Sequence, residues 1–139
     1  MRALHAHLMR RASSRSVLRR LTQQSARETA RPAGQLRICG TADTDKLGFG
    51  DANDRETPTA LPALADVPIS AVACGKGHVL ALGASGDVYA WGNNGSGQLG
   101  TGNTAKAATP LKVDALSQIG VTALACGSHH SLALTEAGE

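Results

Sequence analysis

Two pairs of potential metal ligands recur along the 139-residue chain with the same internal spacing. Cys74 stands four positions before His78, and Cys126 stands four positions before His130. Two thiolates and two imidazoles are the ligand set of a structural zinc site. Repetition argues against that site, because equivalent residues of successive structural units face separate units and do not converge on one ion. We therefore predict no metal site, and expect buried free thiols and imidazoles that hydrogen-bond the backbone of the following turn.

The stretch from Gly95 to Gly100, G-S-G-Q-L-G, spells the glycine fingerprint of a dinucleotide-binding loop, with Asp114 downstream. That chemistry requires a helix that begins at the third glycine and directs its N-terminus at the pyrophosphate. Residues 101–104, T-G-N-T, begin no apolar helical period. Tight turns account for the same glycines, since glycine accepts a positive φ. No nucleotide cofactor is predicted.

Candidates for catalysis and for calcium binding are weaker still. Residues 128–131, S-H-H-S, place hydroxyls beside imidazoles, but neighbours on a strand or tight turn project apart and no carboxylate recurs to orient them. Asp43, Asp45 and Asp51 lie in one acidic loop, yet the spacing lacks the later bidentate glutamate of a calcium loop. We predict a solvated loop, no catalytic, cofactor-binding or metal-binding residue, and no enzymatic activity.

The sequence segments that carry these residues occur twice in the chain, 52 positions apart. Seventeen positions are identical across the two units without a gap, among them the T-P pair at 57–58 and 109–110 and the cysteines and histidines above. Such agreement across several residue types indicates a structural repeat. We divide the body into a first unit, residues 35–87, and a second unit, residues 88–139.

Within each unit, short apolar stretches of period two end at glycine, which is typical of antiparallel strands. Pro58 and Pro110 indicate edge strands, because proline cannot donate to a sheet ladder. The sequence therefore predicts an all-β fold. The expected strands are 36–39, 70–74 and 79–82 in the first unit, and 88–91, 122–126 and 131–134 in the second.

The second unit carries a long composite motif: V-Y-A-W-G-N-N-G-S-G-Q-L-G-T-G at 88–102, then T-P, then A-C-G-S-H-H-S-L-A-L at 125–134. It resembles the repeat of the regulator of chromosome condensation (RCC1) family. The resemblance covers residues 36–139 and is looser in the first unit, where Cys39 stands at the position of Trp91. It implies a partial β-propeller of about two repeats with four-stranded antiparallel blades, in a family whose members close seven blades.

Two blades are too few for a closed ring, which needs four to eight. Glu139 ends the sequence where the next strand is expected to start. We therefore expect a piece of a longer protein or a truncated gene model. The alternative is a ring assembled from several copies of the chain.

The resemblance also bears on function. It implies a protein-interaction module whose partner is a small GTPase or an organellar ribosomal or RNA-processing complex, with guanine nucleotide exchange on a small GTPase as the alternative. Trp91 is expected to pack between blades. The family includes a plant light sensor built on clustered tryptophans, and the single indole of this chain cannot reproduce that cluster.

The formal charge of +3 and the pI near 9.0 conceal an uneven distribution. Residues 1–34 carry eight arginines against Glu28, whereas residues 35–139 carry six basic and ten acidic side chains, a balance of 6 − 10 = −4. An acidic body makes direct nucleic-acid binding unexpected. The Arg- and Ser-rich segment 1–34 is predicted to be a mitochondrial transit peptide. The alternatives are a chloroplast signal, or a disordered or helical basic tail on a cytoplasmic or nuclear protein.

Two further features complete the sequence-based expectations. No run of 18 apolar residues exists, so no membrane-spanning helix is predicted. The three cysteines, which include Cys39, cannot all pair within one chain, and this favours a reducing compartment.

Overall fold

The computed structural model describes residues 33–137, and these fold into eight β-strands without an α-helix. Residues 1–32 of the predicted targeting segment lie outside the described range, as does Glu139. No helix within residues 33–137 has the length and apolar character needed to cross a membrane. The strands are β1 (Arg37–Gly40), β2 (Arg55–Ala60), β3 (Ile69–Cys74), β4 (His78–Gly83), β5 (Val88–Gly92), β6 (Ala107–Lys112), β7 (Val121–Cys126) and β8 (Ser131–Thr135).

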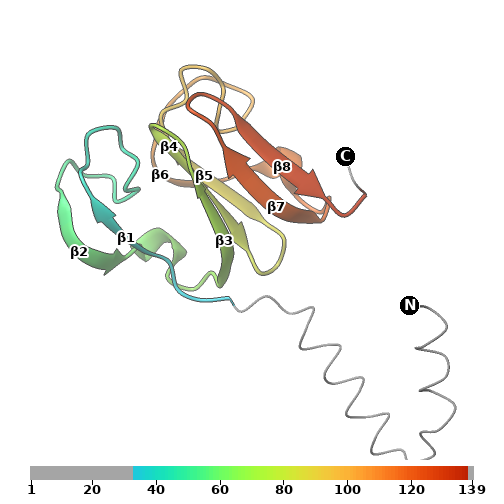
Figure 1. Cartoon of the computed structure of the whole chain (residues 1–139), viewed down its shortest axis with the longest axis horizontal. Helices are drawn as coiled ribbons and strands as arrows, with labels where there is room; N and C mark the ends of the chain where they lie inside the picture. Colours follow the sequence, from blue (N-terminus) through green and yellow to red (C-terminus); the bar gives the residue numbers. More distant parts are fainter. Residues whose placement is uncertain (1–32, 138–139) are drawn as a thin grey trace, which may run out of the picture. The chain divides into compact units, whose positions relative to one another are not determined.

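The strands form one complete blade flanked by two half-blades (Figure 1). The complete blade is a four-stranded antiparallel sheet in the order β3-β4-β5-β6, and β1-β2 and β7-β8 are two-stranded sheets. The 52-residue offset carries β1 and β2 onto β5 and β6, and carries β3 and β4 onto β7 and β8. The complete blade therefore takes two strands from each sequence repeat, so the sheet is out of phase with the repeat by half a unit.

The six strands expected from the sequence are confirmed to within two residues at either end. Pro58 and Pro110 lie inside β2 and β6, and β6 is an edge strand of the four-stranded blade. The pairing of β5 with β6 shifts register between Ala90 and Gly92, opposite the stretch that contains Pro110. At an edge position or in an irregular ladder, no N–H donor is required at the proline, which has none.

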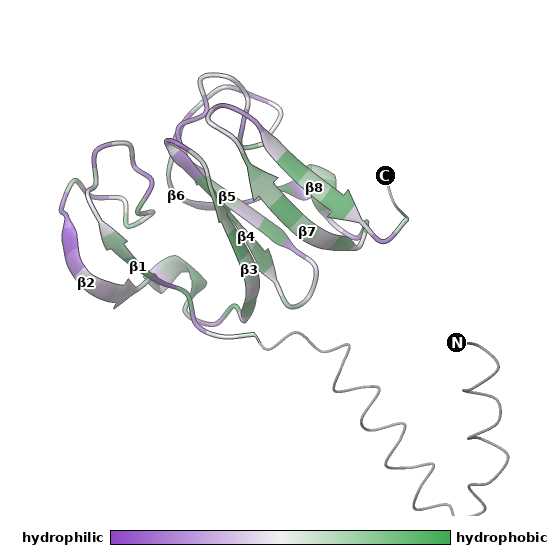
Figure 2. Ribbon diagram, in the orientation of Figure 1, coloured by the Kyte–Doolittle hydropathy of each residue, from purple (hydrophilic) through white to green (hydrophobic). Residues whose placement is uncertain are grey.

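The hydrophobic core lies where the blade meets its neighbours. All six residues of β4 are buried, and Trp91, Leu61, Leu64 and Leu99 are almost completely inaccessible. Two short 3₁₀ helices, η1 (Pro62–Leu64) and η2 (Asp114–Leu116), follow β2 and β6 in the chain. Figure 2 shows that apolar residues concentrate in β3, β4, β7 and β8, whereas β2 is hydrophilic. Of these strands, β4 is buried throughout, whereas Leu132 and Leu134 of β8 are exposed.

Candidate functional site

Four connections lie together at one end of the strands, and we call them the loop rim: residues 41–54, 75–77, 93–106 and 127–130. They share this end because alternate connections of an antiparallel meander fall on the same side. Lys106 contacts Asp45 across two of these connections, with 2.7 Å between Nζ and Oδ2. Two others meet where a Cβ built on Gly75 would lie 2.7 Å from the carbonyl oxygen of Gly127. A Cβ built on Gly77 would lie 3.3 Å from Asn93 Cβ, which joins the two pairs of loops, so the loop rim is a continuous surface.

One buried amide organises the loop of residues 93–106. Asn94 is fully buried, and its Nδ2 donates to the carbonyl oxygens of Asn103 at 3.0 Å and Ala105 at 2.9 Å. The backbone N–H of Leu99 donates to Asn94 Oδ1 at 3.0 Å. A single side chain thus holds both limbs of the loop. Asn94 is the last residue of the W-G-N-N stretch at 91–94 of the composite motif, and its structural role was not predicted from the sequence.

The glycines of the apparent dinucleotide fingerprint belong to this loop and adopt turn conformations. Gly97 and Gly100 have φ values of +74° and +69°, and their N–H groups donate to the carbonyl oxygens of Asn94 and Gly97. No helix begins after them, since residues 101–106 lead into β6. The interpretation of these glycines as turn residues is confirmed.

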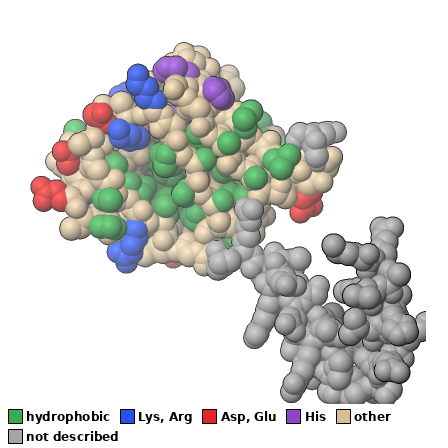
Figure 3. Space-filling view, in the orientation of Figure 1, with side chains coloured by type: hydrophobic (Ala, Val, Ile, Leu, Met, Phe, Trp, Pro, Cys, Tyr) green, Lys and Arg blue, Asp and Glu red, His purple; other side chains and the backbone are tan. Residues whose placement is uncertain are grey.

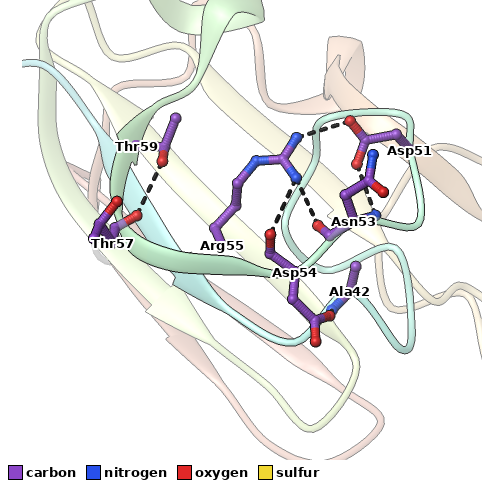
Figure 4. Close-up of polar contacts among 7 residues, drawn as sticks. All are labelled: Ala42, Asp51, Asn53, Asp54, Arg55, Thr57 and Thr59. Atoms are coloured by element: carbon purple, nitrogen blue, oxygen red, sulfur yellow. Dashed lines mark hydrogen bonds and ion pairs between the residues drawn. The ribbon is translucent and has the colours of Figure 1, made fainter.

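The corresponding loop of the first repeat, residues 41–54, is closed by different groups (Figure 4). Ala42 occupies the position of Asn94, and its N–H donates to Asp54 Oδ1 at 2.9 Å. Asp51 Oδ1 accepts from the N–H of Asn53 at 3.0 Å, in the way that the equivalent Asn103 accepts from Ala105. The carboxylate of Asp54 therefore replaces the missing amide in tying the loop together.

Arg55 anchors this loop to the start of β2. Its guanidinium donates to Asp51 Oδ2 at 2.7 Å and to the carbonyl oxygen of Asn53 at 2.7 Å. The same group lies 4.2 Å from the centroid of the Phe49 ring. The hydrogen bonds from Arg55 hold the pKa of Asp51 below its usual value.

The three aspartates considered for calcium binding each face a separate basic side chain. Hydrogen bonding from Lys46 lowers the pKa of Asp43, as Arg55 lowers that of Asp51. Within residues 33–137, no three histidine, cysteine or acidic side chains gather into a metal-binding group. The ion pairs are Asp43–Lys46 at 2.9 Å, Asp45–Lys106 at 2.7 Å and Asp51–Arg55 at 2.7 Å.

Trp91 joins the complete blade to the β1-β2 half-blade. Its indole is fully buried, and Nε1 donates to the carbonyl oxygen of Lys46 at 2.8 Å. The ring lies directly against Gly48, where a Cβ would sit 2.8 Å from Nε1. The expectation that Trp91 packs between blades is confirmed.

A second contact joins the complete blade to the β7-β8 half-blade. Ser131 Oγ donates to the carbonyl oxygen of Gln98 at 2.7 Å and lies 3.0 Å from Nε2 of the buried His78. Because the hydroxyl hydrogen is used on Gln98, His78 must donate through Nε2 and is in the Nε2–H tautomer. Gln98 is the repeat equivalent of Lys46, so the same loop position accepts the clamping hydrogen bond at both junctions.

The hydrogen bond between His78 and Ser131 differs from the bond to the backbone that was expected for this imidazole. His78 Nε2 bonds the hydroxyl of Ser131 from the β7-β8 half-blade, and its Nδ1 has no hydrogen-bond partner among the described residues, so the expected bond to the backbone of the following turn is not formed. Burial lowers the pKa of His78, and the nearby His129 and His130 lower it further. The imidazole donates to Ser131 and does not accept from it, which is the wrong direction for activating a nucleophile.

The cysteines also differ from expectation. Cys74 is exposed, because it ends the edge strand β3, so the prediction of a buried thiol is wrong at this position. Cys126 is partly buried and its Sγ lies 3.5 Å from the carbonyl oxygen of Ala73. Burial raises the pKa of the Cys126 thiol, with a further increase from Cys74. Cys39, Cys74 and Cys126 are all free thiols.

Comparison with protein families gives a match over both units. A model of the regulator of chromosome condensation (RCC1) repeat matches residues 34–82 and 85–134, and a second model of the same repeat matches residues 69–98. These ranges cover most of the described part of the chain.

Individual relatives match over a similar range. The ultraviolet-B receptor UVR8 of Arabidopsis thaliana is 45% identical over 101 residues, which are 72% of this chain and 23% of UVR8. The mitochondrial RCC1 domain-containing protein RUG3 of the same plant is 37% identical over 106 residues, 76% of this chain and 24% of RUG3. The chain therefore spans about a quarter of the length of these two relatives.

Among solved structures, Prp20p from Saccharomyces cerevisiae superposes with a TM-score of 0.67 and 29% identity. The match covers 80% of this chain and 28% of that of Prp20p, whose structure was studied together with its binding properties to Gsp1p and histones. The agreement in fold and sequence covers both repeats.

Proposed function

This chain belongs to the regulator of chromosome condensation (RCC1) repeat family, and on that premise we propose that it is a non-catalytic module whose loop rim binds a protein partner. The observation that carries the proposal is the construction of the rim. Its long loops are tied internally by Asn94 and by Asp54, so the backbone that carries their exposed side chains is held in one arrangement. Binding to a preorganised surface loses less conformational entropy than binding to mobile loops.

The rim also presents charged and polar side chains for recognition. Lys76 and His129 are exposed at neighbouring turns, and Lys106 is exposed beside Asp45 (Figure 3 shows such basic and histidine side chains close together). Side chains of both signs at one surface favour a partner of complementary charge pattern over a uniformly charged one. A folded protein surface meets that requirement better than a phosphate backbone does.

We propose a small GTPase as the partner class, and an organellar ribosomal or RNA-processing complex as the alternative. The likeness to Prp20p, with its binding properties to Gsp1p, supports the first choice. Guanine nucleotide exchange is the second candidate function and is favoured by the same likeness. The chain covers only 28% of Prp20p, so exchange requires that this portion contain the exchange surface.

Binding to a panel of purified small GTPases, each with GDP, with GTP and without nucleotide, tests the partner class. We expect saturable binding of the full chain to at least one GTPase by calorimetry. Replacing Lys76 and His129 together with glutamate should weaken it at least about tenfold, because two rim side chains change sign or gain charge. The control Asp66→Lys reverses an exposed charge next to η1, away from the rim, and should leave the affinity unchanged.

The possible results separate the candidates. Absence of binding across the panel would contradict the GTPase proposal, and equal affinity of the rim variant would contradict the assignment of the rim. Faster nucleotide release from the bound GTPase would establish exchange, and unchanged release would leave a binding module.

We further propose that the protein is mitochondrial. The composition of residues 1–34 and the similarity to the mitochondrial protein RUG3 support this location. A fluorescent reporter fused behind residues 1–34 should co-localise with a mitochondrial dye, and replacement of all eight arginines by glutamine should abolish import, because the signal depends on positive charge. A diffuse cytosolic signal from the unchanged fusion would contradict the proposal.

A further inference from the structure

The loop of residues 93–106 contains a dipeptide that is chemically unstable. Asn94 is followed by Gly95, and this is the only Asn-Gly pair in the sequence. In such a pair the backbone nitrogen of the glycine attacks the side-chain carbonyl carbon of the asparagine, because glycine has no Cβ to hinder the approach and its backbone rotates freely. A five-membered succinimide ring forms and ammonia leaves. The pair is therefore a candidate site of spontaneous deamidation.

The closed loop holds the side chain of Asn94 away from this reaction. Asn94 is fully buried, and its Nδ2 donates to the carbonyl oxygens of Asn103 at 3.0 Å and Ala105 at 2.9 Å. Its Oδ1 accepts from the N–H of Leu99 at 3.0 Å. Rotation of the amide toward Gly95 would break these bonds and leave buried polar groups without partners.

The attacking nitrogen is held as well. The N–H of Gly95 donates to Asn93 Oδ1 at 3.2 Å. The turn that follows is fixed by the N–H of Gly97, which donates to the carbonyl oxygen of Asn94 at 2.9 Å. Attack requires the Gly95 nitrogen to leave its hydrogen bond and approach Asn94 Cγ. A loop that engages both reacting groups in other hydrogen bonds suppresses the reaction until the loop opens.

The product of the reaction does not fit the closed loop. Hydrolysis of the succinimide leaves aspartate or isoaspartate at position 94, and the ionised carboxylate has no donor. It would face the carbonyl oxygens of Asn103 and Ala105, which are both acceptors. Burial of an unpaired charge against acceptors is strongly unfavourable. The reaction therefore removes the group that holds the two limbs of the loop together.

The first repeat provides a comparison within the same chain. In the loop of residues 41–54, Ala42 occupies the position of Asn94 and is followed by Asp43. This loop is tied by Asp54, whose Oδ1 accepts from the N–H of Ala42 at 2.9 Å. A carboxylate that faces a donor is stabilised by a charge-assisted hydrogen bond. The reactive pair and the dependence on a buried amide thus belong to the loop of the second repeat.

We propose that Asn94 is a deamidation site that the closed loop protects and that reacts when the loop opens. The Gly95 nitrogen forms a bond to Asn94 Cγ, the bond from Cγ to Nδ2 breaks, and the proton of the glycine N–H leaves with Nδ2 as ammonia. Water then adds to one of the two ring carbonyls and opens the ring. The net change converts an amide and water into a carboxylate and ammonium. This inference is independent of the partner proposed above.

Deamidation at position 94 is measured in the full chain by peptide mass spectrometry. The chain is incubated in native buffer and in guanidinium chloride at the same temperature and mildly alkaline pH. We expect the reaction in denaturant to be at least about tenfold faster, because the reactive conformation is reached only from the open loop.

Gly95→Ala tests the chemistry of the site. In denaturant it should slow the reaction at least about tenfold, because a Cβ hinders the attack. The variant should fold, since the nearest atom to a Cβ built at this position is 3.7 Å away.

Asn103→Ala tests whether loop closure gives the protection. Asn103 Oδ1 accepts from the N–H of Ala105 at 2.9 Å, so its loss loosens the limb that Asn94 holds. We expect the native rate to rise at least about threefold and the rate in denaturant to stay the same, because the reactive pair is unchanged. Asn53→Ala, at an exposed position in the loop of residues 41–54, is the matched control and should change neither rate.

Asn94→Asp reproduces one product of the reaction. Its denaturation midpoint in guanidinium chloride should be lower than that of the unchanged chain. Asn93→Asp is the matched control at the exposed neighbouring position, where a carboxylate still accepts from the N–H of Gly95, and it should leave the midpoint nearly unchanged.

Folding of Asn103→Ala is checked by the emission of the buried Trp91, which shifts to longer wavelength if the core opens. If the variant fails this check, Thr101→Val takes its place, because it removes a 3.4 Å contact with Asn94 Nδ2. Four results would each overturn the proposal: equal rates in native buffer and denaturant, no reaction at position 94 in denaturant, a native rate that the loop variant leaves unchanged, or an Asn94→Asp variant as stable as the unchanged chain.

Discussion

Replacement of Trp91 by alanine is expected to lower the free energy of unfolding by about 3–5 kcal/mol. The indole is completely buried at the junction of two sheets, and its removal leaves a cavity between them. The Lys46 carbonyl oxygen also loses the hydrogen bond that the indole N–H donates at 2.8 Å. Urea denaturation followed by far-UV circular dichroism measures the change without relying on the lost fluorophore.

Two comparison variants separate the contributions at this position. Trp91→Phe retains an aromatic ring but removes the donor, and should cost about 1–3 kcal/mol. Tyr89→Ala, two residues earlier on β5 and only partly buried, should cost less than Trp91→Ala. An effect of Trp91→Ala no larger than that of Tyr89→Ala would show that the two sheets are held together by other contacts.

Gly92→Ala is expected to destabilise the blade by about 4 kcal/mol or more, enough to unfold a marginally stable domain. A Cβ at this position would overlap the Gly77 carbonyl oxygen and lie 2.8 Å from His78 Cα. Both obstacles are backbone atoms at the buried start of β4, so neither can rotate away. The φ of +99° adds strain for any residue with a side chain.

Gly86→Ala is the matched control for this substitution. Gly86 has a similar φ of +91°, but nothing lies within 4 Å of a Cβ built there. Its replacement should cost only the conformational strain, about 1–2 kcal/mol. The difference between the two variants in urea denaturation therefore measures the steric contact, and equal effects would show that the close approach of β5 to β4 relaxes without cost.

Much of the local structure follows from the sequence alone because its causes are local. Short apolar stretches located β1, β3, β4, β5, β7 and β8, and the repeat offset related each strand to its equivalent. The glycines within residues 95–100 were predicted to be turn residues, and Gly97 and Gly100 have the positive φ values of such turns. Pro58 and Pro110 indicated edge strands, since a residue without an N–H excludes itself from the middle of a ladder.

The contacts within the candidate site were less accessible to sequence reasoning. Nothing local distinguishes Asp54, which closes one loop, from Asp43 and Asp51, which pair with basic side chains. The bond from His78 to Ser131 joins residues 53 positions apart. Which side chains become hydrogen-bond partners depends on how loops from neighbouring units contact each other.

The sequence by itself determined that this protein is a β-repeat of the RCC1 type, where six of its eight described strands lie, and that its basic charge resides in residues 1–34. Only the tertiary structure decided that the complete blade combines two strands from each repeat. Periodicity and turn chemistry act over a few residues and recur identically in each unit. Strand pairing, by contrast, depends on which strand edges meet in space. Because the local pattern is the same in both repeats, it does not show at which strand a blade begins.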